Sequence, residues 1–243
     1  MGLGVTDIAS LGTILGVWAH PDDETFCMGG LMALAAANGQ TVVCITATKG
    51  EAGSQDATRW PLDTLGGTRA IELTTALQIL GAKHHHWLRH ADGDCSHATD
   101  EAALAELMPL VEKYQPDTII TFPPDGLTGH EDHKAVCHWA GLIAAAAKKP
   151  PQVYYAVNTT DEASYLKELD DKFNFFFNLD QPVLHDKATC DMVLDLPPEI
   201  FDKKYRAFQV MPSQYENLLQ SYPKDYLAHA FGRESYILAS KFK

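Results

Sequence analysis

The chain has 243 residues, of which 46% are hydrophobic and 21% charged, a balance typical of a globular protein with a sizeable core. Its formal net charge of −13 argues against a general nucleic-acid or anionic-membrane surface, so neither is an expected partner. The five cysteines form no Cys-x-x-Cys pair, the first 15 residues carry no basic side chain, and no apolar stretch approaches the roughly 18 residues of a membrane span. These features predict a cytoplasmic protein with reduced thiols.

Strand-like and helix-like patterns alternate over the first two thirds of the chain. The segment over 25–38, rich in Ala, Leu and Met, ends at Gly39, a common stop signal for a helix. Such alternation predicts βαβ units, and therefore a parallel sheet with right-handed crossovers. The expected strands cover 13–19, 41–47, 84–88, 118–122 and 152–157, and the expected helices cover 25–38, 67–80, 100–114 and 130–149.

The pattern is less regular after residue 157. Strands are expected at 173–179, 192–196 and 235–241, with a helix over 199–222. The chain contains no internal repeat and no Ser/Gly linker, which favours a single domain over 1–243. Its expected architecture is α/β, a Rossmann-like and mostly parallel sheet flanked by helices, with a core over about 11–157 and a subsidiary C-terminal part over about 158–243.

Two polar clusters follow two of the predicted strands. The segment 19–24 reads Ala-His-Pro-Asp-Asp-Glu and ends the first strand, and the segment 129–133 reads Gly-His-Glu-Asp-His and follows the strand over 118–122. The carboxyl ends of parallel strands share one sheet edge, so the two clusters should lie together. For the first cluster alone, an acidic turn that caps the next helix is the alternative. The pairing of the clusters favours a shared metal site.

Histidine and aspartate in these clusters suit a catalytic divalent metal. A catalytic zinc takes three nitrogen or oxygen ligands and keeps one position open for water, and His20, Asp23 and His133 would supply such a set. Asp22 would then remain to accept a proton. His130 stands three residues before His133, a spacing that lets both rings face one pocket. Taken singly, both histidines also suit a helix surface or a helix cap.

These motifs carry a family resemblance. The sequence resembles the LmbE-like, PIG-L family of zinc-dependent N-deacetylases, which includes deacetylases of the mycothiol and bacillithiol pathways. Beyond the two clusters, the resemblance covers Thr-Lys-Gly-Glu-Ala-Gly at 48–53, Leu-Gly-Gly-Thr-Arg-Ala-Ile-Glu-Leu at 65–73 and the turn at 92–93. A weaker match in the last third involves Lys204, Ala207, Ser213 and Gln214. Residues 158–200 match no part of the family pattern.

The resemblance implies an LmbE-like fold, one Zn²⁺ per chain and a hydrolase. The expected substrate is a small N-acetylglucosamine-type sugar conjugate, whose N-acetyl amide is cleaved to acetate and a free amine. His20, Asp23 and His133 match the zinc ligands of the family. Asp22 matches the general base that later protonates the leaving amine.

Further roles follow from the same resemblance. His130 matches the histidine that stabilises the oxyanion, and Arg69 and Asp92 match positions that hold sugar hydroxyls. Asp132 is expected to orient His20 or His130 from behind the ligands. In two places the chain departs from the family. Thr128 replaces a tyrosine of the mycothiol-pathway enzyme, and Met211 replaces a histidine found in many relatives, which removes a ligand at the pocket rim.

Three alternatives remain at this point. The first is a metal-dependent phosphoesterase, although such enzymes usually hold two metals and more ligands than this sequence offers. The second is a non-catalytic relative that binds a sugar conjugate. The third is a nucleotide-binding α/β protein, which lacks support because no Gly-rich phosphate loop follows the first strand. The exact sugar conjugate and homo-oligomerisation are left open by the sequence.

Overall fold

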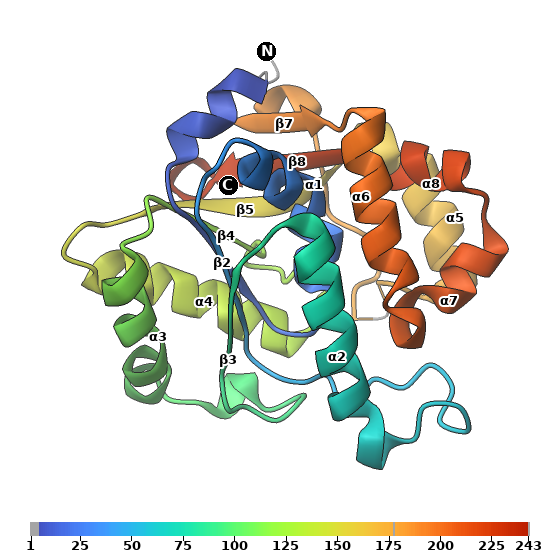
Figure 1. Cartoon of the computed structure of the whole chain (residues 1–243), viewed down its shortest axis with the longest axis horizontal. Coiled ribbons are helices and arrows are strands. Elements are labelled where there is room, and N and C mark those ends of the chain that lie inside the picture. The colour runs from blue at the N-terminus through green and yellow to red at the C-terminus, as the bar shows by residue number, and fades with distance from the viewer. Residues whose placement is uncertain (1–4, 177, 243) are drawn as a thin grey trace.

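A mixed β-sheet crosses the molecule in the computed structural model, which describes residues 5–176 and 178–242 (Figure 1). Within these residues the strand order is β3-β2-β1-β4-β5-β8-β7. The first five strands of this order are parallel, and β8 and β7 run antiparallel at the far edge. The bounds are β1 Ile14–Trp18, β2 Val42–Thr46, β3 His84–Trp87, β4 Thr118–Thr121, β5 Gln152–Thr159, β7 Met192–Asp195 and β8 Arg233–Leu238, and the short β6 Leu184–His185 pairs with β5.

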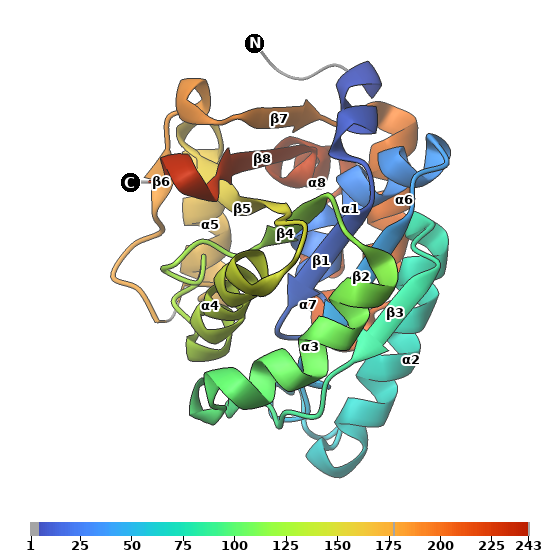
Figure 2. The same ribbon diagram turned by 90° about the vertical axis from the view of Figure 1, so that its left-hand side faces the viewer.

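Helices cover both faces of the sheet (Figures 1 and 2). One layer contains α1, α2 and α6, which contact one another, and the other contains the paired α3 and α4. Every residue of β1, β2 and β4 is buried between these layers, which explains the nearly continuous apolar composition of β1 and β2. The layer helices are α1 Asp23–Ala37, α2 Leu62–Leu80, α3 Asp100–Tyr114, α4 Glu131–Ala146 and α6 Pro198–Gln209.

Three further helices gather beside α6, at the right of Figure 1. They are α5 Ala163–Phe173, α7 Pro212–Ser221 and α8 Lys224–Phe231. Short 3₁₀ helices occur at Val5–Leu11, Cys95–His97, Thr160–Glu162, Lys187–Thr189 and Ala239–Lys241. Across the described part of the chain, no helix combines the length and the apolar character that a membrane crossing requires.

The predicted fold class is confirmed, with expected and observed core elements differing by a few residues at their ends. The residues after 158 were expected to form a subsidiary part. They add β8 and β7 to the same sheet, because β8 pairs directly with β5. The chain therefore continues the central sheet after β5.

Several C-terminal predictions are wrong. The aromatic segment 173–179 is no strand in its described residues, since α5 ends at Phe173 and Asn174 caps it in the left-handed conformation; residue 177 lies outside the described residues. The helix expected over 199–222 is two helices, because Pro212 disfavours a helical conformation at Met211. The strand expected over 235–241 ends at Leu238. The amphipathic α5 and α8 were missed.

The strand order places a crevice between β1 and β4. From β1 the chain moves outward to β2 and β3, then returns to β4 on the other side of β1. The loops after β1 and β4 therefore leave the sheet next to each other, at the point where open α/β sheets bind ligands. Both polar clusters of the sequence are in these loops.

Candidate active site

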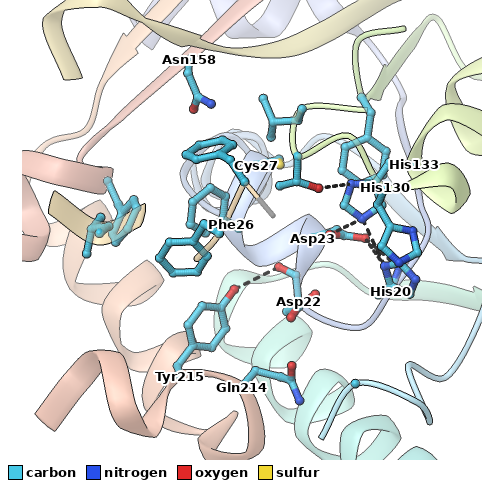
Figure 3. Close-up of a pocket in the computed structure, with 18 of the residues that line it drawn as sticks. His20, Asp22, Asp23, Phe26, Cys27, His130, His133, Asn158, Gln214 and Tyr215 are labelled. Atoms are coloured by element: carbon cyan, nitrogen blue, oxygen red, sulfur yellow. Dashed lines mark hydrogen bonds and ion pairs between the residues drawn. The ribbon is translucent and has the colours of Figure 1, made fainter. Parts of the chain in front are cut away.

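A cavity of about 310 Å³ lies at the carboxyl ends of the parallel strands (Figure 3). Its polar lining comes from the loops after β1, β2, β3 and β4, from the start of α4, and from the neighbouring α2 and α7. Of the residues predicted from the sequence, those that line the cavity are His20, Asp22, Asp23, Arg69, Asp92, His130 and His133. The remaining one, Asp132, is fully buried behind His20.

Three of these side chains point their donor atoms at one another. His20 Nδ1 lies 3.1 Å from His133 Nε2, and the carboxylate of Asp23 lies 3.7 Å from the first atom and 3.5 Å from the second. Ligands about 2.0–2.1 Å from a tetrahedral zinc are roughly 3.3 Å apart. The observed separations bracket this value, so the three donors fit a single divalent ion.

Each of the two histidines uses its second ring nitrogen in a hydrogen bond, and this determines which nitrogen faces the proposed metal position. His20 Nε2 donates to the carboxylates of Asp92, at 3.0 Å, and Asp132, at 3.2 Å. His133 Nδ1 donates to the carbonyl oxygen of Gly126 at 2.9 Å. Metal-binding histidines use their second nitrogen in this way, which fixes the tautomer and leaves a lone pair for the metal. When a metal displaces the second proton of His20, that lone pair would be on Nδ1 of His20 and on Nε2 of His133.

Two other groupings of potential ligands share His20. His20, Asp92 and Asp132 are close enough to hold an ion, as are His20, His130 and His133. In the first grouping the carboxylates already accept backbone hydrogen bonds. Asp92 accepts one from Ala52, and Asp132 accepts from Gly93 and Cys95. Both carboxylates thus already accept hydrogen bonds from the backbone and from His20 Nε2. This favours a role in holding the His20 ring over a role as metal ligands.

His130 lies at the edge of this cluster as the N-cap of α4. Its Nδ1 accepts a hydrogen bond from the backbone N–H of Asp132 at 3.1 Å, and its ring packs edge-to-face on His20 with centroids 4.7 Å apart. Burial, together with the charge of His20, lowers the pKa of His130. A neutral ring that accepts at Nδ1 carries its hydrogen on Nε2. His130 is therefore suited to donate a hydrogen bond into the cavity.

Asp22 stands beside the cluster as a partly exposed carboxylate. Burial raises its pKa, while the guanidinium of Arg69, 3.2 Å from Oδ2, opposes the rise. Glu24, whose role the sequence left open, is fully buried and accepts from the backbone N–H of Asp22 at 2.9 Å and from the Thr46 hydroxyl at 2.9 Å. Glu24 therefore ties the loop after β1 to β2.

Charge in the site is predominantly negative. Burial lowers the pKa of His20, but its hydrogen bonds to Asp132 and Asp92 raise it to about 10. Burial and the neighbouring Asp22 raise the pKa of Asp23 to about 7. The clustered carboxylates thus create a negative potential that favours protonated neighbours. A bound divalent cation would be stabilised by the same negative potential.

Arg69 holds two loops of the site together. The residue is only 3% exposed, and its guanidinium donates to the carbonyl oxygens of Gly50, at 2.8 Å, and Pro21, at 3.1 Å. Gly50 has a φ of +63°, and a Cβ there would lie 2.2 Å from Arg69 Nη1. Only glycine permits this approach. Arg69 and Asp92 thus support the loops and the His20 ring, and their contact with sugar hydroxyls stays a prediction.

The two departures from the family pattern occupy different environments. The hydroxyl of Thr128 lies 3.3 Å from His133 Nδ1, beside the proposed ligands. Met211 is fully buried, and the hydroxyl of Thr25 donates to its sulfur at 3.7 Å. Its position is therefore inside the protein and not at the pocket rim, which corrects the interpretation made from the sequence.

The sequence missed much of the cavity wall. Tyr215 donates to the backbone carbonyl of Asp22 at 3.3 Å, and its neighbour Gln214 lines the mouth. The Ser-Gln match at 213–214 was the only signal for this wall. The apolar part of the lining comes from helices and loops far apart in the chain. Its members are Phe26, Phe122, Leu127, Leu166, Leu169, Phe175, Phe176 and Phe231.

A known protein-family model matches part of the chain. The family model described as PIG-L, GlcNAc-PI de-N-acetylase, matches residues 15–147. The chain is similar to 1D-myo-inositol 2-acetamido-2-deoxy-alpha-D-glucopyranoside deacetylases. It is 33% identical to that of Mycolicibacterium gilvum, over 62% of this chain and 60% of the relative, and 35% identical to that of Corynebacterium diphtheriae, over 60% and 56%. The chain thus spans about half to three fifths of the curated relatives it matches first.

Solved structures resemble the whole fold. The N,N'-diacetylchitobiose deacetylase from Pyrococcus horikoshii has a TM-score of 0.69 at 16% identity and covers 98% of this chain and 88% of its own. The 4-carboxy-2-hydroxymuconate hydratase GalB from Pseudomonas putida has a TM-score of 0.63 at 21% identity, with 94% and 96% covered. Enzymes with different reactions share this fold, so the reaction has to be argued from the site.

Proposed function

Because the chain belongs to the PIG-L family, we propose that it is a zinc-dependent hydrolase of the N-acetyl amide in an N-acetylglucosamine-type conjugate. The observation that carries the proposal is the convergence of His20 Nδ1, His133 Nε2 and the Asp23 carboxylate beside Asp22. Those three side chains would hold one zinc ion per chain. When bound, zinc activates water and polarises the amide carbonyl.

Asp22 is the proposed general base. It lines the cavity next to the ligand Asp23, and its pKa, raised by burial, helps it to accept a proton from the attacking water. The same carboxyl group then protonates the nitrogen of the leaving amine. Arg69 fixes the carboxylate through the 3.2 Å ion pair. General base catalysis of this kind contributes about 10²–10⁴-fold to the rate.

His130 is the proposed donor to the oxyanion. Its neutral ring carries hydrogen on Nε2, since Nδ1 accepts from the backbone of α4. A placed donor of this kind contributes roughly 3–4 kcal/mol to stabilising the transition state. The products are acetate and the free amino sugar. Sugar hydroxyls would lie in the polar part of the cavity, whose lining includes Arg69 and Asp92.

The relatives' names suggest the first substrates to test. N-acetylglucosaminyl-inositol and N,N'-diacetylchitobiose would be incubated with the zinc-loaded protein, and acetate release measured. Wild-type protein should release acetate from at least one of them. Asp22→Asn should bind one zinc per chain and lose at least about 10²-fold in kcat. His20→Ala should lose both zinc binding and turnover.

An exposed carboxylate supplies the control. Asp63, in the first turn of α2, is exposed, so Asp63→Asn should retain wild-type kcat. Wild-type turnover by Asp22→Asn under saturating zinc would disprove its role as base. No acetate release from any N-acetylglucosamine conjugate would disprove the function, and two tightly bound metals per chain would favour the phosphoesterase.

A further inference from the structure

The inner end of the active-site cavity is apolar, and removal of an acetyl group alone makes little use of it. Its lining includes Leu127, Leu166, Phe176 and Phe231, which are only 4–7% exposed. Ligand cavities bind apolar groups by such surfaces, because water leaves them favourably. An acetyl group has one methyl to place here, which leaves most of this wall uncovered.

This apolar end lies directly next to the reacting groups. Cys27 follows Asp23 by one helical turn on α1, so both side chains share one face. Figure 3 shows Phe26 and Cys27 between the Asp22–Asp23 pair and Asn158. On the opposite wall the ring of Phe122 stacks on His133, with centroids 3.9 Å apart. A group attached to the scissile carbonyl therefore meets apolar surface at once.

The mouth of the cavity has the opposite character. Gln55, Asp92 and Gln214 line it, and Gln55 donates to the backbone carbonyl of Gln214 at 2.6 Å, across the entrance. Sugar hydroxyls need hydrogen-bond partners when they leave water. Such partners line the mouth and surround the reacting groups, while the inner end of the main cavity has Asn158 among its apolar side chains. The sugar is therefore expected outside and the acyl group inside.

A second, small cavity of about 40 Å³ continues the inner end. It shares Phe26, Leu166 and Phe231 with the main cavity. Polar and charged side chains complete its lining, namely Glu162, Lys204, Arg233, Glu234 and Ser235. Glu162 Oε1 and Ser235 Oγ are buried without a hydrogen-bond partner among the described residues. An alkyl chain that reached these two oxygens would also exclude water from them, which costs free energy. They therefore limit the length of any apolar group bound here.

We propose that the natural substrate carries an N-acyl group longer than acetyl, with its alkyl chain in the apolar inner end of the cavity. The proposal rests on the amide hydrolysis proposed above and replaces the acetyl group of that substrate by a longer acyl group, so that N-acetyl conjugates are the poorer substrates. Water adds to the carbonyl, the C–N bond breaks, a C–O bond forms, and the products are a medium-chain carboxylate and the protonated amino sugar. Each methylene buried contributes about fourfold in affinity.

Isomeric ligands test the orientation as well as the chain length. Methyl N-hexanoylglucosaminide and pentyl N-acetylglucosaminide have the same atoms, with the alkyl chain on opposite ends of the sugar. Methyl N-acetylglucosaminide is the reference. Wild-type kcat/KM for the hexanoyl compound should exceed that for the reference at least tenfold, and the pentyl glycoside should gain less. A hexanoyl compound no better than the reference, or a larger gain for the pentyl glycoside, would overturn the proposal.

Binding to the Asp22→Asn variant gives a readout that does not depend on hydrolysis. Calorimetric Kd values should follow the same order, with hexanoyl at least tenfold tighter than acetyl. If wild-type protein hydrolyses none of the three compounds, the proposed function fails, while the Kd order still decides the present inference. Equal Kd values for acetyl and hexanoyl would overturn it even in an active enzyme.

A filled inner end should remove the preference. Leu166→Trp places a larger side chain in the shared wall of both cavities and should lower the hexanoyl-to-acetyl ratio of kcat/KM at least tenfold. Leu110→Trp, at a half-buried position on α3, is the matched control and should keep the wild-type ratio. Leu166→Phe is a milder second variant in case tryptophan prevents folding. An unchanged ratio in a folded Leu166 variant would refute the placement of the chain.

Discussion

Asp132 joins His20, a proposed metal ligand, to a loop of the fold, so its isosteric replacement tests both links. The carboxylate is completely buried at the start of α4. One oxygen accepts from His20 Nε2 at 3.2 Å and from the backbone of Gly93 at 2.8 Å, and the other accepts from the backbone of Cys95 at 3.0 Å. In Asp132→Asn the amide keeps one acceptor oxygen and replaces the other with an NH₂ group.

The size of the effect follows from the hydrogen bonds that the amide cannot make. Whichever way the amide turns, its NH₂ group faces at least one buried N–H, and an unsatisfied buried donor costs about 1–3 kcal/mol. Turning the oxygen toward His20 and Gly93 leaves Cys95 without an acceptor, and the reverse leaves the other two. We therefore expect about 1–3 kcal/mol less stability. Outer contacts of metal-binding histidines typically change metal affinity by about 10–100-fold, so zinc should bind weaker by that factor.

Two assays separate these effects. Urea unfolding of the metal-free protein measures the free energy of unfolding, and competition with a chelating dye measures zinc affinity in the folded protein. Asp94→Asn is the control, because the Asp94 side chain is 63% exposed. Within the described residues its ionic partner is His97, which is also exposed. Zinc affinity within twofold of wild type in Asp132→Asn, with an unchanged unfolding free energy, would refute the reasoning.

Three other perturbations address the metal and the fold. Zinc at 100 times its Kd stabilises the folded state by about 2.7 kcal/mol. Chelation of the zinc should therefore lower the midpoint of thermal unfolding by roughly 5–11 °C. An unchanged midpoint would show that the protein holds no such metal. Gly50→Ala should lower the free energy of unfolding in urea by about 1–3 kcal/mol. Its φ of +63° is strained for alanine, and the new Cβ would meet the buried guanidinium of Arg69. Gly67→Ala is the control, because the space around Gly67 is open and the protein should not be destabilised. Lys204→Met should lower the free energy of unfolding by about 3–5 kcal/mol, because Glu234 would stay buried without its ionic partner. Lys224→Met removes an exposed ion pair with Asp202 and is the control. An equal loss in the two variants would contradict the prediction.

Much of the fold could be predicted because the signals are local. Buried strands such as β1 and β2 have continuous apolar composition, and α1 ends where glycine follows it. The C-terminal third was harder to predict. An aromatic run at 173–179 has strand-like composition, yet its conformation depends on the left-handed cap at Asn174 and on Asp170, whose side chain accepts from the backbone of Phe176. Tertiary contacts of this kind override propensity.

The proposed ligand set and general base could be read from the amino-acid order, because two short motifs contain all of these residues. Each motif is only five or six residues long and follows one of two neighbouring strands. The atoms of His20 and His133 that face the site could not be read in this way, because their orienting partners come from distant loops and are brought to them by folding. The shape of the cavity beyond them likewise depends on the folded chain. Leu166 on α5 and Phe231 on α8 reach the site because α5 contacts α8 and α8 contacts β8, and no local pattern records such long-range contacts.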